Sequence, residues 1–150
     1  MKILVTVGTT KYDSLIQYMD SEPELKDMSI EFQIANGKYI PQNHPYFTFI
    51  DSANFAKKVL EADCVITHAG ATVYELLEMR KKFIAVPNFE RSDKLQIDIA
   101  DFLAKNRYAF VAYSFAQLRF LLDVTKTYEF KQYNKESFSK AEEILEFLFS

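Results

Sequence analysis

The feature that most constrains this sequence is a set of short, continuous apolar runs that end in small or polar residues. Ile3–Val7 is rich in β-branched residues and runs into Gly8, and Cys64–Thr67 and Phe83–Pro87 repeat the pattern. A strand that is apolar at every position has both faces buried, as strands of parallel sheets do. These runs therefore predict a parallel sheet that is covered on both sides.

The segments between these runs supply helices and further strands. Apolar residues at helical spacing predict helices at residues 13–19, 55–61, 72–80, 95–105 and 115–124. Shorter apolar or alternating segments predict strands at residues 30–34, 46–50 and 109–112. Strand and helix alternate along the chain, which predicts an α/β fold: a Rossmann-like, open, mostly parallel sheet with helices on both faces.

The length of 150 residues is that of one domain, and the sequence has no internal repeat, linker or low-complexity segment. We therefore expect a single domain over residues 1–150. Near its end, Phe138, Ala141, Ile144, Leu145 and Leu148 recur at helical spacing. This pattern predicts an amphipathic helix at 135–149 that packs back on the domain.

Composition and charge exclude several classes of protein. Hydrophobic residues make up 49% and charged residues 26% of the chain, as in ordinary globular domains. The net charge is -3 and the cations are scattered among acids, so no nucleic-acid partner is expected. The apolar start, Lys2–Val7, is too short for a signal peptide or a membrane span. No cluster has zinc-like spacing, so no metal site is predicted.

The one cysteine, Cys64, lies inside an apolar strand and has no partner for a disulfide within the chain. Nothing therefore suggests an oxidising compartment, and a cytoplasmic protein is the default expectation. We interpret Cys64 as a buried, inert thiol rather than a nucleophile.

Ligands of open parallel sheets bind beyond the carboxyl ends of the strands. The residues that follow each predicted strand are therefore the candidates for function. They are Gly8–Asp13, Asn36–Ile40, His68–Glu75 and Asn88–Gln96.

The segment His68–Glu75 is the most informative of the four. Gly70 and Ala71 allow a sharp turn from strand to helix, and amides at a helix start attract anions such as a diphosphate. His68 can donate a hydrogen bond to a phosphate oxygen, and the Glu75 carboxylate can accept both ribose hydroxyls. The alternative is structural: Thr72-x-x-Glu75 is also a capping box, in which each side chain satisfies a backbone amide.

The segment after the first predicted strand also allows both a functional and a structural interpretation. Gly8, Thr9 and Thr10 can line a phosphate site, or form a tight turn before a helix capped by Asp13. The segment lacks the three-glycine dinucleotide fingerprint and the phosphate-loop lysine.

The segment after the strand at 83–87 is polar. Asn88 stands at its start, and Asp93 and Gln96, three residues apart at a helix start, can reach one sugar together. Here the structural alternative is helix capping by Ser92 or Asp93.

Taken together, these segments resemble the C-terminal domain of glycosyltransferase family 28. The resemblance is carried in order by VTVGTTKYDSLI (residues 5–16), QIANGKYIP (33–41), ADCVITHAGA (62–71) and VPN (86–88). It covers about residues 2–111. It is strongest to stand-alone members: the β subunits of exopolysaccharide and capsule glycosyltransferases and the catalytic subunit of the dolichol-linked N-acetylglucosaminyltransferase.

The resemblance implies one half of a GT-B glycosyltransferase with a site for a uridine-diphosphate sugar. It places the diphosphate at the turn from His68 to Ala71, the ribose at Glu75 and the sugar at Asp93 and Gln96, with His68 as the catalytic residue. It implies no cofactor, since the donor is itself the substrate.

The resemblance also implies a second, membrane-anchored subunit that binds a lipid-linked acceptor. The chain would then be peripheral at the cytoplasmic membrane face and would function in polysaccharide or glycan biosynthesis. A non-catalytic regulatory or interaction subunit with the same fold is the alternative.

The sequence departs from the family pattern at two places. The family usually has one more residue between the turn glycine and the glutamate, so the spacing from His68 to Glu75 is shorter by one. Lys94-Leu95 also replaces the family's usual Asn-His before Gln96. The first difference lies in the predicted diphosphate turn and the second beside the predicted sugar contact.

Overall fold

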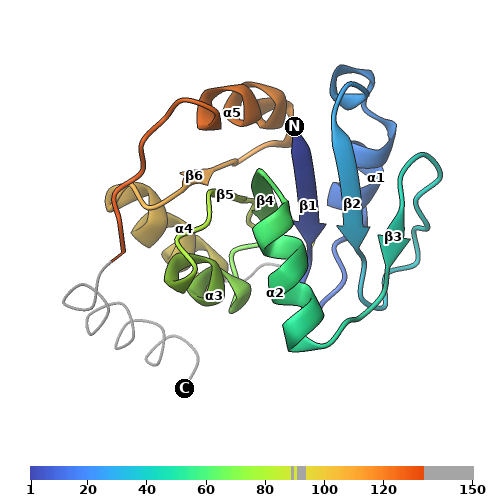
Figure 1. The fold of residues 1–150 in the computed structure, drawn as a ribbon, viewed down its shortest axis with the longest axis horizontal. Coiled ribbons are helices and arrows are strands. Elements are labelled where there is room, and N and C mark those ends of the chain that lie inside the picture. Colours follow the sequence, from blue (N-terminus) through green and yellow to red (C-terminus); the bar gives the residue numbers. More distant parts are fainter. Residues whose placement is uncertain (89, 91–93, 134–150) are drawn as a thin grey trace.

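The computed structural model describes residues 1–88, 90 and 94–133. Its strands form one six-stranded sheet in the order β3-β2-β1-β4-β5-β6, and every neighbouring pair is parallel (Figure 1). The predicted Rossmann-like α/β fold is confirmed.

The bounds of the elements follow the predicted alternation closely. The strands are β1 (Lys2–Thr6), β2 (Ser29–Gln33), β3 (Tyr46–Phe47), β4 (Cys64–Thr67), β5 (Phe83–Ala85) and β6 (Phe110–Val111). The helices are α1 (Asp13–Ser21), α2 (Ser52–Glu61), α3 (Thr72–Glu78), α4 (Lys94–Lys105) and α5 (Leu118–Thr125), with 3-10 turns at Pro23–Leu25 and Phe115–Gln117. The predicted helix at 135–149 lies outside the described residues.

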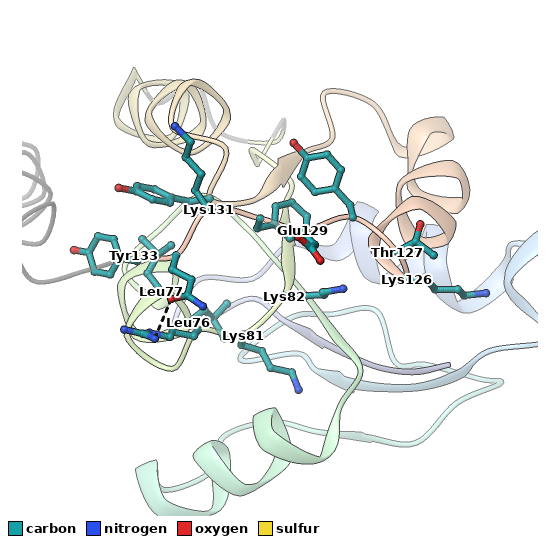
Figure 2. Close-up of a pocket in the computed structure, with 14 residues that line it drawn as sticks. Leu76, Leu77, Lys81, Lys82, Lys126, Thr127, Glu129, Lys131 and Tyr133 are labelled. Atoms are coloured by element: carbon teal, nitrogen blue, oxygen red, sulfur yellow. Dashed lines mark hydrogen bonds between the residues drawn. The ribbon is translucent and has the colours of Figure 1, made fainter.

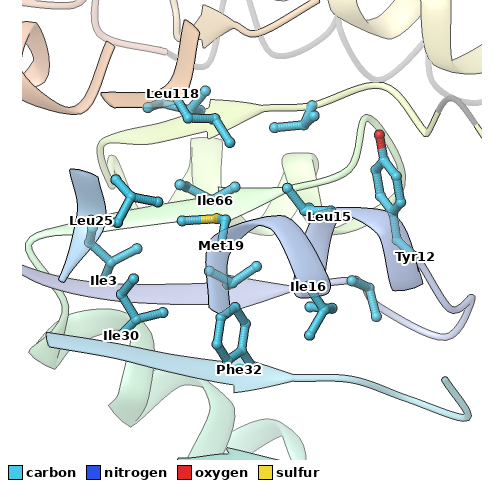
Figure 3. Close-up of a cluster of buried hydrophobic side chains, with 14 of the residues drawn as sticks. Ile3, Tyr12, Leu15, Ile16, Met19, Leu25, Ile30, Phe32, Ile66 and Leu118 are labelled. Atoms are coloured by element: carbon cyan, nitrogen blue, oxygen red, sulfur yellow. The ribbon is translucent and has the colours of Figure 1, made fainter. Parts of the chain in front are cut away.

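The central strands of the sheet are buried on both faces: β4 and β5 at every residue and β1 from Ile3 to Thr6. On one face, side chains of α1 and α5 pack on alternate residues of β1, β2 and β4, such as Ile3, Phe32 and Ile66 (Figure 3). On the other face, α2, α3 and α4 pack on the intervening residues, such as Leu4 and Val65. The alternation follows from the two-residue period of a strand.

Several element ends differ from the predicted ones. Helix α2 begins before Phe55 because the Asp51 carboxylate caps it, with its Oδ1 accepting a hydrogen bond from the Asn54 amide at 2.8 Å. Strand β3 stops at Phe47, which pairs with Gln33, the last residue of β2. Helix α3 ends before Arg80, whose φ of 53° is left-handed and ends a helix.

Candidate functional site

A cleft of about 290 Å³ lies at the carboxyl edge of the sheet, where β1, β2 and β4 end. It is lined by Thr6, Gly8, Thr9, Gln33, Phe49, Ile50, Ser52, Phe55, Thr72 and Glu75. The loop after β1 and the start of α3 therefore meet in one place, although more than 60 residues separate Gly8 from Thr72. The parallel pairing of β1 with β4 brings them together.

The His68 imidazole fills the space between the two glycines of the site. A Cβ atom built on Gly8 would lie 3.0 Å from His68 Cε1, and one built on Gly70 would lie only 2.2 Å from His68 Nε2. Gly8 also has a left-handed φ of 68°, which favours glycine. Both glycines thus make room for the histidine ring, so the predicted Gly8 and His68 segments form one structural unit.

Gln33, at the end of β2, holds the loop after β1 in place. It is 4% exposed, and its Oε1 accepts hydrogen bonds from Thr6 Oγ1 at 2.6 Å, the Val7 amide at 2.9 Å and the Gly8 amide at 3.1 Å. Its Nε2 donates to the carbonyls of Gly8 and Thr48, each at 2.9 Å. One buried amide therefore joins the floor of the cleft to the segment after β3.

The turn from β4 into α3 does not form the capping box. Ala71, an exposed residue, is the N-cap of α3, and no side chain caps this end by a hydrogen bond. Thr72 and Glu75 instead lie on the wall of the cleft, and Glu75 is exposed. Within the turn, the Gly70 amide donates to the His68 carbonyl at 3.0 Å, and the Val73 amide donates to the Gly70 carbonyl at 3.1 Å.

Asp13 does not cap α1 either. The N-cap is Tyr12, and the Asp13 carboxylate instead accepts hydrogen bonds from the backbone amides of Lys38 and Tyr39 at 3.2 and 3.3 Å. The carboxylate thereby joins the start of α1 to the segment that follows β2. Thr10 is half-buried and does not line the cleft.

Asn88 and Gln96 bind each other after β5. The buried Gln96 accepts a hydrogen bond at Oε1 from the Asn88 amide at 2.6 Å. Asn88 Nδ2 in turn donates to the Lys11 carbonyl at 3.3 Å. Neither residue lines the cleft, but they link the end of β5 to the loop after β1. Asp93, the predicted partner of Gln96, lies outside the described residues.

Sequence reasoning missed the wall of the cleft formed by Phe49, Ile50, Ser52 and Phe55. Phe49 is 59% exposed, which is unusual for a phenylalanine. Phe49 and Ile50 fall in the segment 46–50, for which the sequence predicts a strand, whereas β3 ends at Phe47.

The described part of the chain lacks both a metal-binding cluster and a membrane-spanning helix. It contains no group of three or more His, Cys, Asp or Glu side chains placed to hold a metal ion. Within residues 1–88, 90 and 94–133, the structure shows no helix with the length and apolar character needed to cross a membrane.

Comparison with known proteins identifies the family of this chain. The human UDP-N-acetylglucosamine transferase subunit ALG13 is 30% identical in an alignment of 120 residues, and the match covers 72% of this chain and 11% of the human protein. The solution structure of ALG13 superposes with a TM-score of 0.66 over 99% of this chain and 96% of that structure, at 17% identity.

The chain also resembles half of a larger enzyme. The structure of MurG from Acinetobacter baumannii superposes with a TM-score of 0.61 at 24% identity, over 85% of this chain and 41% of MurG. The similarity between these structures shows the fold alone. The sequence itself matches the glycosyltransferase family 28 C-terminal domain over residues 2–144. The chain therefore belongs to the glycosyltransferase family 28 C-terminal domain family, as its motifs implied.

Proposed function

We propose that this chain is the donor-binding subunit of a two-component glycosyltransferase that transfers a hexosyl group from a UDP-sugar to a lipid-linked acceptor. The observation that carries the proposal is that the Gly8 loop and the Thr72–Glu75 face of α3 line one cleft. His68 does not line the cleft, but its ring lies against Gly8, which does. The cleft lies where open parallel sheets bind ligands. Membership of a glycosyltransferase family also supports the proposed function.

The lining of the cleft suits the parts of a nucleoside diphosphate. The hydroxyls of Thr9 and Thr72 line the cleft and offer hydrogen bonds to phosphate oxygens. The His68 imidazole is not part of the lining but lies beside Gly8, where we propose that it donates to a phosphate oxygen. The exposed Glu75 carboxylate can accept hydrogen bonds from ribose hydroxyls. The exposed aromatic ring of Phe49 offers a flat apolar surface on which the base can stack.

His68 is the proposed catalytic residue. When the bond to the sugar breaks, negative charge builds on the leaving diphosphate, and a hydrogen bond from the imidazole stabilises it. A general base must lie within hydrogen-bond reach of the acceptor hydroxyl. We assign none in this chain, because we place the acceptor in the partner subunit.

The sugar would lie toward Asp93 and Gln96, which follow β5. Gln96 Oε1 accepts a hydrogen bond from the Asn88 amide. Its part in binding is therefore to hold Asn88 and the loop around it, with Asp93 as the proposed direct contact.

A membrane-anchored partner is proposed to complete the enzyme. The human relative is named as a subunit of a UDP-N-acetylglucosamine transferase. MurG is longer, and this chain covers 41% of it. We propose that the acceptor-binding half is a separate chain and that the described domain is held at the cytoplasmic membrane face through it.

Titration calorimetry tests the donor site. We expect UDP to bind, and ADP to bind at least about tenfold more weakly, because we propose that the site distinguishes uracil from adenine. The His68→Ala and Glu75→Gln variants should each weaken UDP binding by roughly tenfold, the loss of one hydrogen bond to a charged group. Glu78→Gln is the matched control, because Glu78 is exposed on the same helix and does not line the cleft. No heat with either nucleotide would contradict the proposal.

The second candidate is a non-catalytic subunit with the same fold. The observation that favours it is the shortened turn, in which the Gly70, Val73 and Tyr74 amides donate to carbonyls within the chain. This candidate predicts that the chain binds its partner but binds neither UDP nor a UDP-sugar. Sugar transfer by the reconstituted pair that is lost in His68→Ala would exclude it.

A further inference from the structure

A second cavity lies apart from the proposed donor cleft and is larger than it. It has a volume of about 590 Å³ and lies between the end of α3, the start of β5 and the segment 126–133 that follows α5 (Figure 2). Arg80, Lys81 and Lys82 immediately precede β5, so the cavity opens near the amino edge of the sheet. The donor cleft lies at the carboxyl edge, and the two sites share no lining residue.

The cavity concentrates positive charge. Its lining contains the five cations Arg80, Lys81, Lys82, Lys126 and Lys131, and Glu129 is its one acid. The lining therefore has a net charge of +4 in a chain whose net charge is -3, which leaves -7 for the remaining residues. Such a local excess attracts anions.

Within the described part of the chain, carboxylates form few ion pairs with these cations. Within the described residues, only Lys126 of the five cations forms an ion pair, with Asp123 at 3.5 Å. Arg80 donates to the Gln132 side chain at 3.2 Å, and Lys82 donates to the Thr125 carbonyl at 2.7 Å. Both of these acceptors are uncharged, so the positive charge remains.

The negative C-terminal ends of two helices offset part of the positive charge of these cations. Arg80 and Lys81 follow α3, Lys126 follows α5, and the Lys82 ammonium group donates to the carbonyl of Thr125, the last residue of α5. Each helix end carries about half a negative charge, so two ends offset about one of the four net positive charges. Desolvation also lowers the pKa of Lys81, which indicates that water solvates its ammonium group incompletely. The lining therefore keeps about three net positive charges, which favours a ligand that carries several negative charges.

We propose that this cavity binds a phosphate-bearing anion, as a phosphomonoester or diphosphate group. A carboxylate carries one negative charge, whereas a phosphomonoester carries about two. Lysines bind phosphate as point charges, and the hydroxyls of Tyr108, Thr127 and Tyr128 in the same lining offer additional donors. The volume lies within the range of small-molecule sites. Such a group can come from a soluble metabolite or from the head group of an anionic lipid.

The test uses the full chain and a triple variant of the cavity, Lys81→Gln with Lys126→Gln and Lys131→Gln. Arg80 and Lys82 are kept because they hold the structure through Gln132 and Thr125. The matched control removes three exposed lysines outside the cavity, Lys26, Lys57 and Lys105, so that both variants have the same net charge. Thermal unfolding midpoints check that both variants fold.

Calorimetry with inorganic pyrophosphate is the first arm. We expect the cavity variant to lose about a hundred-fold in affinity, while the control loses little. The second arm measures co-sedimentation with phosphatidylcholine vesicles with and without phosphatidic acid. Sedimentation that requires phosphatidic acid and the cavity lysines would identify a lipid head group, whereas pyrophosphate binding alone would identify a soluble ligand.

Nuclear magnetic resonance of the unmodified chain gives a measurement that needs no variant. Pyrophosphate should shift the backbone amide signals of Lys81, Thr127 and Lys131 at lower concentration than those of Gly8 and Gly70. Absence of binding in both arms, an equal loss in both triple variants, or shifts confined to the donor cleft would overturn the proposal.

Discussion

At the scale of single residues, the candidate site depends on how His68 is accommodated. Its imidazole occupies the space that side chains on Gly8 and Gly70 would need. The ring position is therefore set by two residues that lack a side chain. This arrangement allows the role of the ring to be tested without removing it.

We expect Gly70→Ala to displace the imidazole, because the new methyl group would lie 2.2 Å from Nε2. The affinity for UDP should then fall roughly tenfold, as in His68→Ala. In a double-mutant cycle measured by calorimetry, Gly70→Ala should have no further effect once His68 is alanine. Additive losses would show that the methyl group acts on something other than the ring.

A second prediction concerns the buried amide of Gln33. Gln33→Leu leaves the Val7 and Gly8 amides without their acceptor, and it should lower the free energy of unfolding by about 2–4 kcal/mol. Urea denaturation measures the change. Gln17→Leu, on the exposed side of α1, is the control and should change stability by less than about 0.5 kcal/mol. Equal losses would mean that the hydrogen bonds of Gln33 contribute nothing specific.

At the scale of elements, α1 holds the long segment between β2 and β3. Asp13 accepts hydrogen bonds from the Lys38 and Tyr39 amides, and the buried Asp20 accepts from Tyr39 Oη at 2.7 Å and the Gln42 amide at 2.7 Å. The segment has no helix of its own between β2 and β3. Two carboxylates on one helix therefore replace the packing that a crossover helix supplies elsewhere in this fold.

The hydrogen bond from Tyr39 to Asp20 predicts a pH dependence. The Asp20 carboxylate beside it raises the pKa of Tyr39 above 10.0, so the protonated phenol is favoured in the folded state. Its contribution to stability is present below pH 10.0 and is lost as the pH rises through the folded-state pKa. Tyr39→Phe should cost about 1 kcal/mol at neutral pH, and this deficit should shrink above pH 10.0.

Urea denaturation at several pH values measures that deficit. Tyr46→Phe is the control, because Tyr46 is an exposed residue of the edge strand β3. A deficit of Tyr39→Phe that stays constant across the alkaline range would contradict the prediction.

At the scale of the whole molecule, the sheet separates two polar sites. The proposed donor cleft lies at its carboxyl edge and the basic cavity lies near its amino edge, with the packed core between them. Variants at one site should therefore leave ligand binding at the other unchanged, because distant sites with no shared partners act independently.

Cys64 reports on the integrity of this core. It is fully buried, and desolvation raises the pKa of its thiol to about 12. Iodoacetamide should therefore label the folded chain very slowly, and labelling should rise with urea in parallel with global unfolding. The sequence has one cysteine, so no other thiol complicates the measurement. Rapid labelling without urea would show that β4 opens locally.

Most of the fold was predictable because its signals are local. Apolar runs such as Ile3–Val7 and helical spacing in segments such as 95–105 correctly predicted strands and helices. The predictions failed at element ends such as Ser52 and Phe47. These ends depend on a cap or on the length of a neighbouring strand, and apolar periodicity detects neither.

The sequence by itself determined the parallel sheet and the loops that meet at its carboxyl edge, because residue periodicity and chain order decide both. Only the tertiary structure decided that the His68 ring lies between Gly8 and Gly70, that Gln33 holds the Gly8 loop and that Gln96 binds Asn88. The tertiary structure also brought Arg80 and Lys131 to one cavity. These contacts depend on strand order, register and side-chain packing, and none of these is encoded in a local pattern.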